Sequence, residues 1–242
     1  HGTAEEVRTT CSFARAERLL GREYHGRFLI ELLQNAADAW RSDPRSASDR
    51  SRVAVIVGEG PALLVANQGA VMTPEVVIES LGHIGASTKS EGEAIGHKGI
   101  GFKSVLEITL APEIYSGLQE EAPGLAVSFD PQLAKASIVR DSPRWDELLT
   151  SVQGLDPTDE LSAVPILRFP HWVDELPKDV ARLADDGFDT VVRLPFDRRS
   201  AQRLGLDERE WTPQRDRLRA ALRTRSLLLV LDNLEHLLAA RD

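Results

Sequence analysis

The stretch ELLQNAADAW, residues 31–40, combines a helical apolar pattern with a polar stripe. Glu31, Asn35 and Asp38 recur at i, i+4 and i+7, which places them on one face of a helix. The opposite face is apolar from Leu29 to Trp40. A solvated surface helix would carry long Lys and Glu side chains instead, so this stripe predicts a binding or catalytic site. A plain solvated helix face is the alternative.

Composition bounds the class of protein. The length of 242 residues suits one large domain or one and a half, and the net charge of −9 argues against a bulk electrostatic grip on nucleic acid. A local basic patch stays open. The single cysteine, Cys11, excludes an internal disulfide framework and favours a reducing, cytoplasmic setting. The apolar runs are too short and too charged to span a bilayer, so no membrane partner is expected.

The order of predicted elements indicates an α+β fold. Helical periodicity covers residues 4–42 with a break near Gly21, the strands at 52–57 and 62–66 form a hairpin, and a helix starts at Thr73-Pro74. Further strands are predicted at 107–117, 124–130, 164–170 and 190–196, followed by helices at 213–225 and 226–241. This order predicts a two-layer sandwich, with a mainly antiparallel mixed sheet covered by helices on one face.

A glycine-rich segment, GHKGIGFKS (96–104), precedes a predicted helix. It is not a Walker A loop, because Phe102 separates the last glycine from Lys103, and it lacks the spacing of a Rossmann fingerprint. Glycines at a helix start still leave backbone N–H groups free for phosphate, and Lys98 adds positive charge. Lys103 lies inside the helix, where its side chain can point away. A flexible surface loop is the alternative.

Two further segments carry polar residues at strand ends. In VANQGAVMTPE (65–75), Asn67 can hydrogen-bond a base edge and Gly69 lets a base approach, although Asn and Gly also favour ordinary turns. In GFDTVVRLPF (187–196), Thr190 begins a strand, which is unremarkable in isolation.

Taken in order, these segments resemble the GHKL (Bergerat-fold) ATPase superfamily, which includes the Hsp90 amino-terminal domain, DNA gyrase B, MutL and histidine-kinase ATP domains. ELLQNAADA is similar to the N-box, NQGAVMT to the G1 box, IGHKGIGFKS to the G2 box and GFDTVVRL to the closing strand. The segments RFLIELLQNAADA, GHKGIGFKSVLEIT and PEIYSG resemble the sacsin-type branch of Hsp90-like modules. The resemblance covers roughly residues 10–235.

The resemblance implies roles for the α-helical stripe. Glu31 would be the general base that activates water, since a carboxylate can accept its proton. Asn35 would be the Mg²⁺ ligand through its amide oxygen, which suits a hard cation. Asp38 would face the sugar and base side of the nucleotide. The cofactors implied are ATP and Mg²⁺.

The resemblance also implies the remaining nucleotide contacts. Asn67, Gly69, Met72 and Thr190 would surround adenine. The lid and phosphate loop would supply Ser87, Thr88, Lys89, Gly96, His97, Lys98, Gly99, Ile100, Gly101 and Phe102. Two departures stand out: Asn67 occupies the position of the usual Asp, and Val71 that of the second G1 glycine. Both leave base selectivity open.

The expected function is Mg-dependent ATP binding and slow hydrolysis that drives a conformational switch, chaperone-like or in a bacterial, even anti-phage, system. The alternatives are an ATP-gated clamp working with a nuclease on DNA, and a non-hydrolysing nucleotide-sensing scaffold. The whole chain, 1–242, is expected to be one GHKL domain at the front of a longer protein, with 213–242 leading to the next domain. Expected partners are ATP or ADP, further domains of the same polypeptide, an ATP-dependent second copy, and nucleic acid through a partner domain.

Overall fold

The structure is a computed structural model. It describes residues 3–23, 27–47, 49–58, 60–81, 101–119, 124–152, 155, 161–196 and 216. Helices and strands follow one another as α1 (Ala4–Glu23), α2 (Phe28–Arg41), η1 (Pro44–Ala47), β1 (Val53–Val57), β2 (Ala62–Asn67), α3 (Pro74–Leu81), η2 (Gly101–Glu107), β3 (Glu113–Ser116), β4 (Leu125–Ser128), α4 (Pro131–Asp141), α5 (Trp145–Leu149), η3 (Ile166–Arg168), β5 (His171–Trp172), α6 (Lys178–Asp185) and β6 (Thr190–Pro195).

The six strands form one sheet in the order β1-β2-β6-β3-β4-β5, and the five described pairings are all antiparallel. Strand β6 pairs with β2 on one side and with β3 on the other. The register sets Asn67 opposite Thr190, and Thr190 opposite Ser116. Three polar residues therefore lie side by side across the ends of three neighbouring strands.

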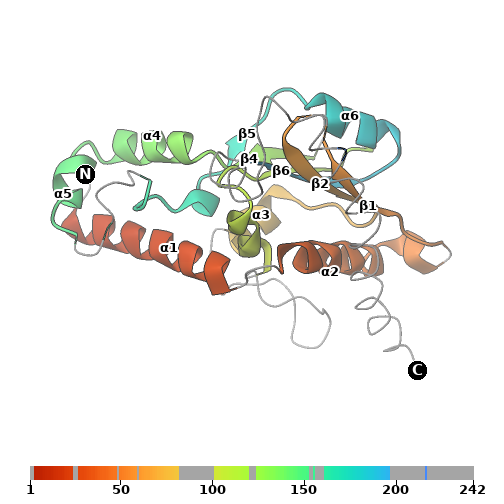
Figure 1. The fold of residues 1–242 in the computed structure, drawn as a ribbon, viewed down its shortest axis with the longest axis horizontal. Helices are drawn as coiled ribbons and strands as arrows, with labels where there is room; N and C mark the ends of the chain where they lie inside the picture. The colour runs from red at the N-terminus through yellow and green to blue at the C-terminus, as the bar shows by residue number, and fades with distance from the viewer. Residues whose placement is uncertain are drawn as a thin grey trace.

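Each face of the sheet is covered by helices (Figure 1). On one face, alternate strand residues such as Leu63 and Val65 pack with Leu32 of α2, Val77 of α3 and Phe102 of η2. On the other face, the intervening residues pack against α6. The α+β class is confirmed, and α6 adds cover on the second face. That face is lined partly by alanines of β2 and β4, which leave room for a helix.

A second core lies beyond the sheet, where α1 packs with α4 and α5 (Figure 1). Trp145 of α5, which is 2% exposed, is its largest buried side chain, and Val7 and Cys11 of α1 contribute to it. Helix α4 begins at Asp130-Pro131, where the Asp130 carboxylate accepts hydrogen bonds from the N–H groups of Gln132 (2.7 Å) and Leu133 (3.1 Å).

Several predicted elements are confirmed and one is wrong. The hairpin, the helix at Pro74 and three of the four later strands occur as expected, and α1 ends at Glu23, close to the break predicted near Gly21. The predicted strand 164–170 is instead the 3₁₀ helix η3. The reason is that the N–H of Ile166, which a strand would offer to a neighbour, donates to the Glu17 carboxylate of α1 at 2.7 Å. The predicted helices at 213–225 and 226–241 lie outside the described residues except for Asp216, which is helical.

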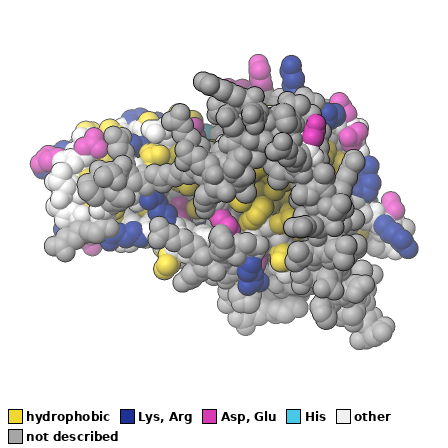
Figure 2. All heavy atoms as spheres, in the orientation of Figure 1, with side chains coloured by type: hydrophobic (Ala, Val, Ile, Leu, Met, Phe, Trp, Pro, Cys, Tyr) yellow, Lys and Arg dark blue, Asp and Glu magenta, His cyan; other side chains and the backbone are white. Residues whose placement is uncertain are grey.

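No helix in the described part of the chain is long and apolar enough to cross a membrane. Figure 2 shows positive and negative side chains interspersed over the visible face, without a patch of one sign among the described residues.

Candidate functional site

The polar stripe of α2 is enclosed. Glu31 is 4% exposed and Asp38 is 7% exposed, whereas Asn35, one turn after Glu31, is half-buried. Arg27 lies 3.6 Å from Glu31, between Nη2 and Oε1, and Arg41 forms an ion pair with Asp38. A plain solvated helix face does not bury two acids, so the stripe belongs to the interior side of the helix.

Gly101, at the start of η2, lies directly against Glu31. A Cβ atom placed on Gly101 would fall 2.2 Å from Glu31 Oε2 and 3.1 Å from its Cδ. Only a residue without a side chain allows the backbone to approach the carboxylate this closely. The structure thus brings together the predicted general base and the end of the glycine segment. Phe102, the next residue, is part of the core beneath the sheet.

The turn after β2 is held against the carboxyl end of α2. Gly69 has φ of +139°, and the N–H of Ala70 donates to the carbonyl of Ala39 at 2.9 Å. A Cβ on Gly69 would lie 2.7 Å from backbone atoms of Ala39 and Trp40. The predicted close approach at Gly69 is therefore an approach to a helix backbone, and it fixes the position of the turn.

Asn67, Thr190 and Ser116 form a polar row on the sheet face that α2 covers, because they alternate in phase with the core residues of their strands. Ser116 Oγ and Thr190 Oγ1 are 2.6 Å apart, and the N–H of Met72 donates to Ser116 Oγ at 2.8 Å. Asn67 Nδ2 donates to the carbonyl of Gln68 at 3.1 Å. The predicted residues Asn67, Met72 and Thr190 are thus gathered at one place.

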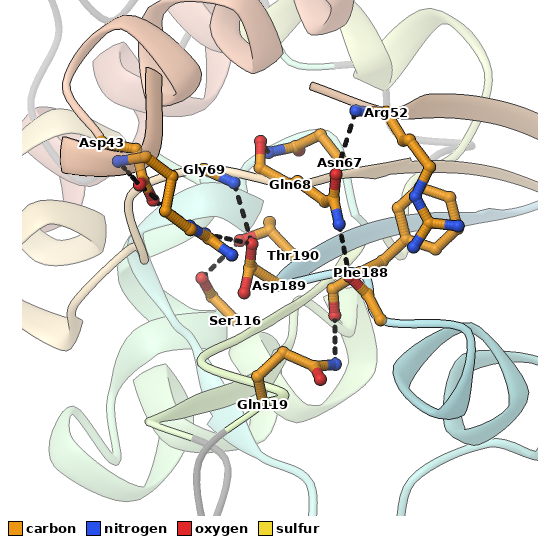
Figure 3. A network of polar contacts seen from close by, with 12 residues as sticks. Asp43, Arg52, Asn67, Gln68, Gly69, Ser116, Gln119, Phe188, Asp189 and Thr190 are labelled. Carbon is orange, nitrogen blue, oxygen red and sulfur yellow. Dashed lines mark hydrogen bonds and ion pairs between the residues drawn. The ribbon is translucent and has the colours of Figure 1, made fainter. Parts of the chain in front are cut away.

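Sequence reasoning missed Ser116 and Asp189 at this place. Ser116 ends the predicted strand at PEIYSG, where a lone polar residue after apolar ones was the available signal. Asp189 directly precedes Thr190, and its carboxylate accepts the N–H of Gly69 at 2.9 Å and an Arg45 N–H at 2.7 Å (Figure 3).

Lys103 points into the protein. Its side chain is fully buried and interacts electrostatically with the buried Glu17 of α1. Burial lowers the pKa of Lys103 and raises the pKa of Glu17 to about 7. The residue is therefore tied to the core behind η2.

The other predicted lid and phosphate residues lie outside the described part of the chain: Ser87, Thr88, Lys89, Gly96, His97, Lys98, Gly99 and Ile100. Among the residues that the structure does describe, no three His, Cys, Asp or Glu side chains gather in a way that could hold a metal ion. That Asn35 binds Mg²⁺ through its amide oxygen stays a prediction.

Comparison with known proteins matches this chain to a family and to one curated protein. The model of the Sacsin domain family matches residues 14–215. Protein NO VEIN of Arabidopsis thaliana is 26% identical over 186 residues, which are 75% of this chain and 5% of that protein. The chain thus corresponds to a small part of NO VEIN. The matched family segment contains the α2 stripe, the turn after β2 and the start of β6.

Proposed function

Because this chain belongs to the Sacsin domain family, we propose that it is a module that binds ATP with Mg²⁺ and hydrolyses it slowly. In this proposal, the nucleotide would lie between α2, the glycine segment and the end of β2. In a longer protein, the bound and hydrolysed states would drive a conformational switch.

The observation that carries this proposal is the contact between Glu31 and Gly101. A carboxylate held against the backbone of a glycine segment lies where the terminal phosphate of a nucleotide on that segment would end. Glu31 would accept a proton from water as the water oxygen bonds to the terminal phosphorus and ADP leaves. Its burial excludes bulk water from the proton acceptor.

The polar row supports recognition of adenine. Because Asn67 Nδ2 donates to Gln68, its amide oxygen remains the group that can accept from the exocyclic amino group of the base. Thr190 lies next to it in register and offers a hydroxyl, which Ser116 orients. An acceptor beside a hydroxyl suits the amino group and ring nitrogen of adenine, and it suits the carbonyl edge of guanine less well.

The residues also fit a magnesium ion. Mg²⁺ takes oxygen ligands and keeps several waters while it binds phosphates, so the Asn35 amide oxygen would add one protein ligand to those of the water and the nucleotide. When bound, the ion would supply neutralisation of phosphate charge. Asn35 follows Glu31 by one helical turn, so the metal ligand and the base project from the same face of α2.

A module that senses nucleotide without turnover is the second candidate. Asn67 and Val71, which replace the residues usual in the resembled family, favour it. The buried Glu31 favours hydrolysis instead, because a pure sensor has no need of a base. A chaperone-like output and a clamp that acts with a nuclease both stay predictions about further domains.

Titration calorimetry with ATP and Mg²⁺, combined with a phosphate-release assay, tests the proposal. The wild-type protein should bind and hydrolyse ATP, and Glu31→Ala should keep binding and lose hydrolysis. Glu175→Ala, at an exposed acid on the surface, is the matched control and should behave as wild type. Binding without hydrolysis in the wild type, even in the longer protein, would support the sensor. Absence of binding would refute both candidates.

A further inference from the structure

Asp189 joins three segments of the candidate site through one buried carboxylate (Figure 3). Asp189 is 4% exposed, and its Oδ2 atom accepts hydrogen bonds from the N–H of Gly69 (2.9 Å) and from Arg45 Nη2 (2.7 Å). Arg45 belongs to η1, which follows α2, and it also donates to Asp43 at 2.7 Å and 2.9 Å. The carboxylate thus connects η1, the turn after β2 and the start of β6.

The backbone of Asp189 strengthens this connection. Its N–H donates to the carbonyl of Asn67 at 3.1 Å, and its carbonyl accepts from the N–H of Leu118, just after β3, at 3.1 Å. The next residue is Thr190, the middle member of the polar row. Any shift of Asp189 would therefore move Thr190 against both of its neighbours.

Burying a carboxylate is strongly unfavourable unless it is paired and hydrogen-bonded. Here the pairing is provided by Arg45, whose guanidinium is held between Asp43 and Asp189, and both contacts raise the pKa of Arg45. The other donor, Gly69, has a left-handed φ and no room for a side chain. The turn cannot adjust freely, so its N–H has a defined position that the carboxylate meets.

We propose that Asp189 is a positioning residue for the base-binding end of the site. It holds the turn at residues 67–72 and Thr190 in one arrangement before the nucleotide arrives. This inference rests on the proposed function, and it concerns affinity alone. Glu31 precedes Ala39, the residue of α2 that meets the Gly69 turn, by eight residues of the helix, so the predicted base lies about two turns away from the part that Asp189 holds. Loss of the carboxylate should therefore weaken ATP binding and leave the chemical step unchanged.

The test uses three variants of Asp189. In Asp189→Asn, an amide oxygen can still accept both hydrogen bonds. Asp189→Ala removes both. Asp189→Glu keeps the negative charge for Arg45 but displaces the oxygens from Gly69 by one methylene. The control is Asp141→Ala, at an exposed aspartate of α4. Each protein is measured for Kd with ATP and Mg²⁺ by calorimetry, for KM and kcat, and for thermal midpoint.

If the released turn is competent to bind for about one tenth of the time, Kd and KM rise roughly ten-fold. We expect this rise in Asp189→Ala and Asp189→Glu with kcat within about two-fold of wild type, and a rise below about three-fold in Asp189→Asn. If Asp189 only stabilised the fold, the Kd of each variant would follow its thermal midpoint, and Asp189→Asn would recover Kd only as far as it recovers the midpoint.

Wild-type Kd and KM in the alanine variant would overturn the inference. If that variant does not fold, a folded Asp189→Glu with wild-type Kd overturns it equally. In both cases the wild-type protein still binds ATP, and the proposed function stands. A wild-type protein that fails to bind ATP removes the proposed function and this inference together.

Discussion

Replacing Gly101 by alanine should separate catalysis from stability. Gly101 does not have a left-handed φ, so its backbone accepts an alanine without strain. The new Cβ would lie 2.2 Å from Glu31 Oε2, whereas carbon and oxygen atoms that are not bonded stay more than about 3 Å apart. The Glu31 carboxylate must therefore retreat by roughly 1 Å.

The expected magnitudes differ for the two properties. The clashing atoms belong to the end of a flexible side chain, so the cost to folding is one altered rotamer, about 0.5–1.5 kcal/mol. For a chain of this size that lowers the thermal midpoint by only a few degrees. A displacement of about 1 Å of a catalytic group, in contrast, can lower kcat on the order of 100-fold.

The assay compares kcat from phosphate release with Kd from calorimetry and with the thermal midpoint. Gly60→Ala is the matched control, because no atom lies within 4 Å of a Cβ at that position. A folded Gly101→Ala protein that hydrolyses ATP at the wild-type rate would refute the reasoning, since the carboxylate would then have moved without consequence. Loss of ATP binding would show that the substitution acts on the phosphate loop instead.

Two further predictions concern stability. Gly69→Ala should lower the free energy of unfolding by roughly 3 kcal/mol. The new Cβ would lie 2.7 Å from backbone atoms of α2, which cannot move aside as a side chain could, and φ of +139° is unfavourable for alanine. Urea denaturation measures the free energy of unfolding, and a wild-type value would contradict the prediction. Burial raises the pKa of Glu17 from 4.5 to about 7, so the folded state binds its proton more tightly than the unfolded state. Stability should then fall as the pH rises from about 4.5 to about 7, by on the order of 3 kcal/mol, and Glu17→Gln should flatten this pH dependence in denaturation midpoints; an equally steep fall in the variant would assign it to another group.

Local patterns in the sequence were sufficient for much of the fold. The 3.6-residue period predicted α2 and its polar stripe, the alternation at 52–57 predicted strand β1, and Thr73-Pro74 predicted the start of α3. The error at 164–170 arose because a side chain far along the chain decides the conformation there. Glu17 follows Val7, Cys11 and Ala14 on the apolar stripe of α1, and an acid on such a stripe needs a partner that local patterns do not name.

The residues of the candidate site that belong to sequence motifs could be predicted. Those that join it through strand pairing or through hydrogen bonds between distant segments could not. Asn67 and Thr190 were recognised separately, but their adjacency follows from the register of β2 and β6, which long-range contacts set. Ser116 was missed because it joins the row only through β3, and Asp189 because its partners Gly69 and Arg45 come from distant segments. The family resemblance implied the roles of the motif residues, and the structure showed which side chains lie next to them.

The place of β6 in the sheet has a consequence for how the protein matures. During synthesis, β2 and β3 leave the ribosome long before β6 (residues 190–195), which pairs with both of them in the finished sheet. Until β6 is made, β2 and β3 each have an unpaired edge that can pair with another chain, so incomplete chains are prone to aggregate. Thr190 also completes the polar row only at that late moment. A truncated product that ends before β6 would therefore be prone to aggregate and would lack Thr190, so, under the proposed function, nucleotide binding would report that folding is complete.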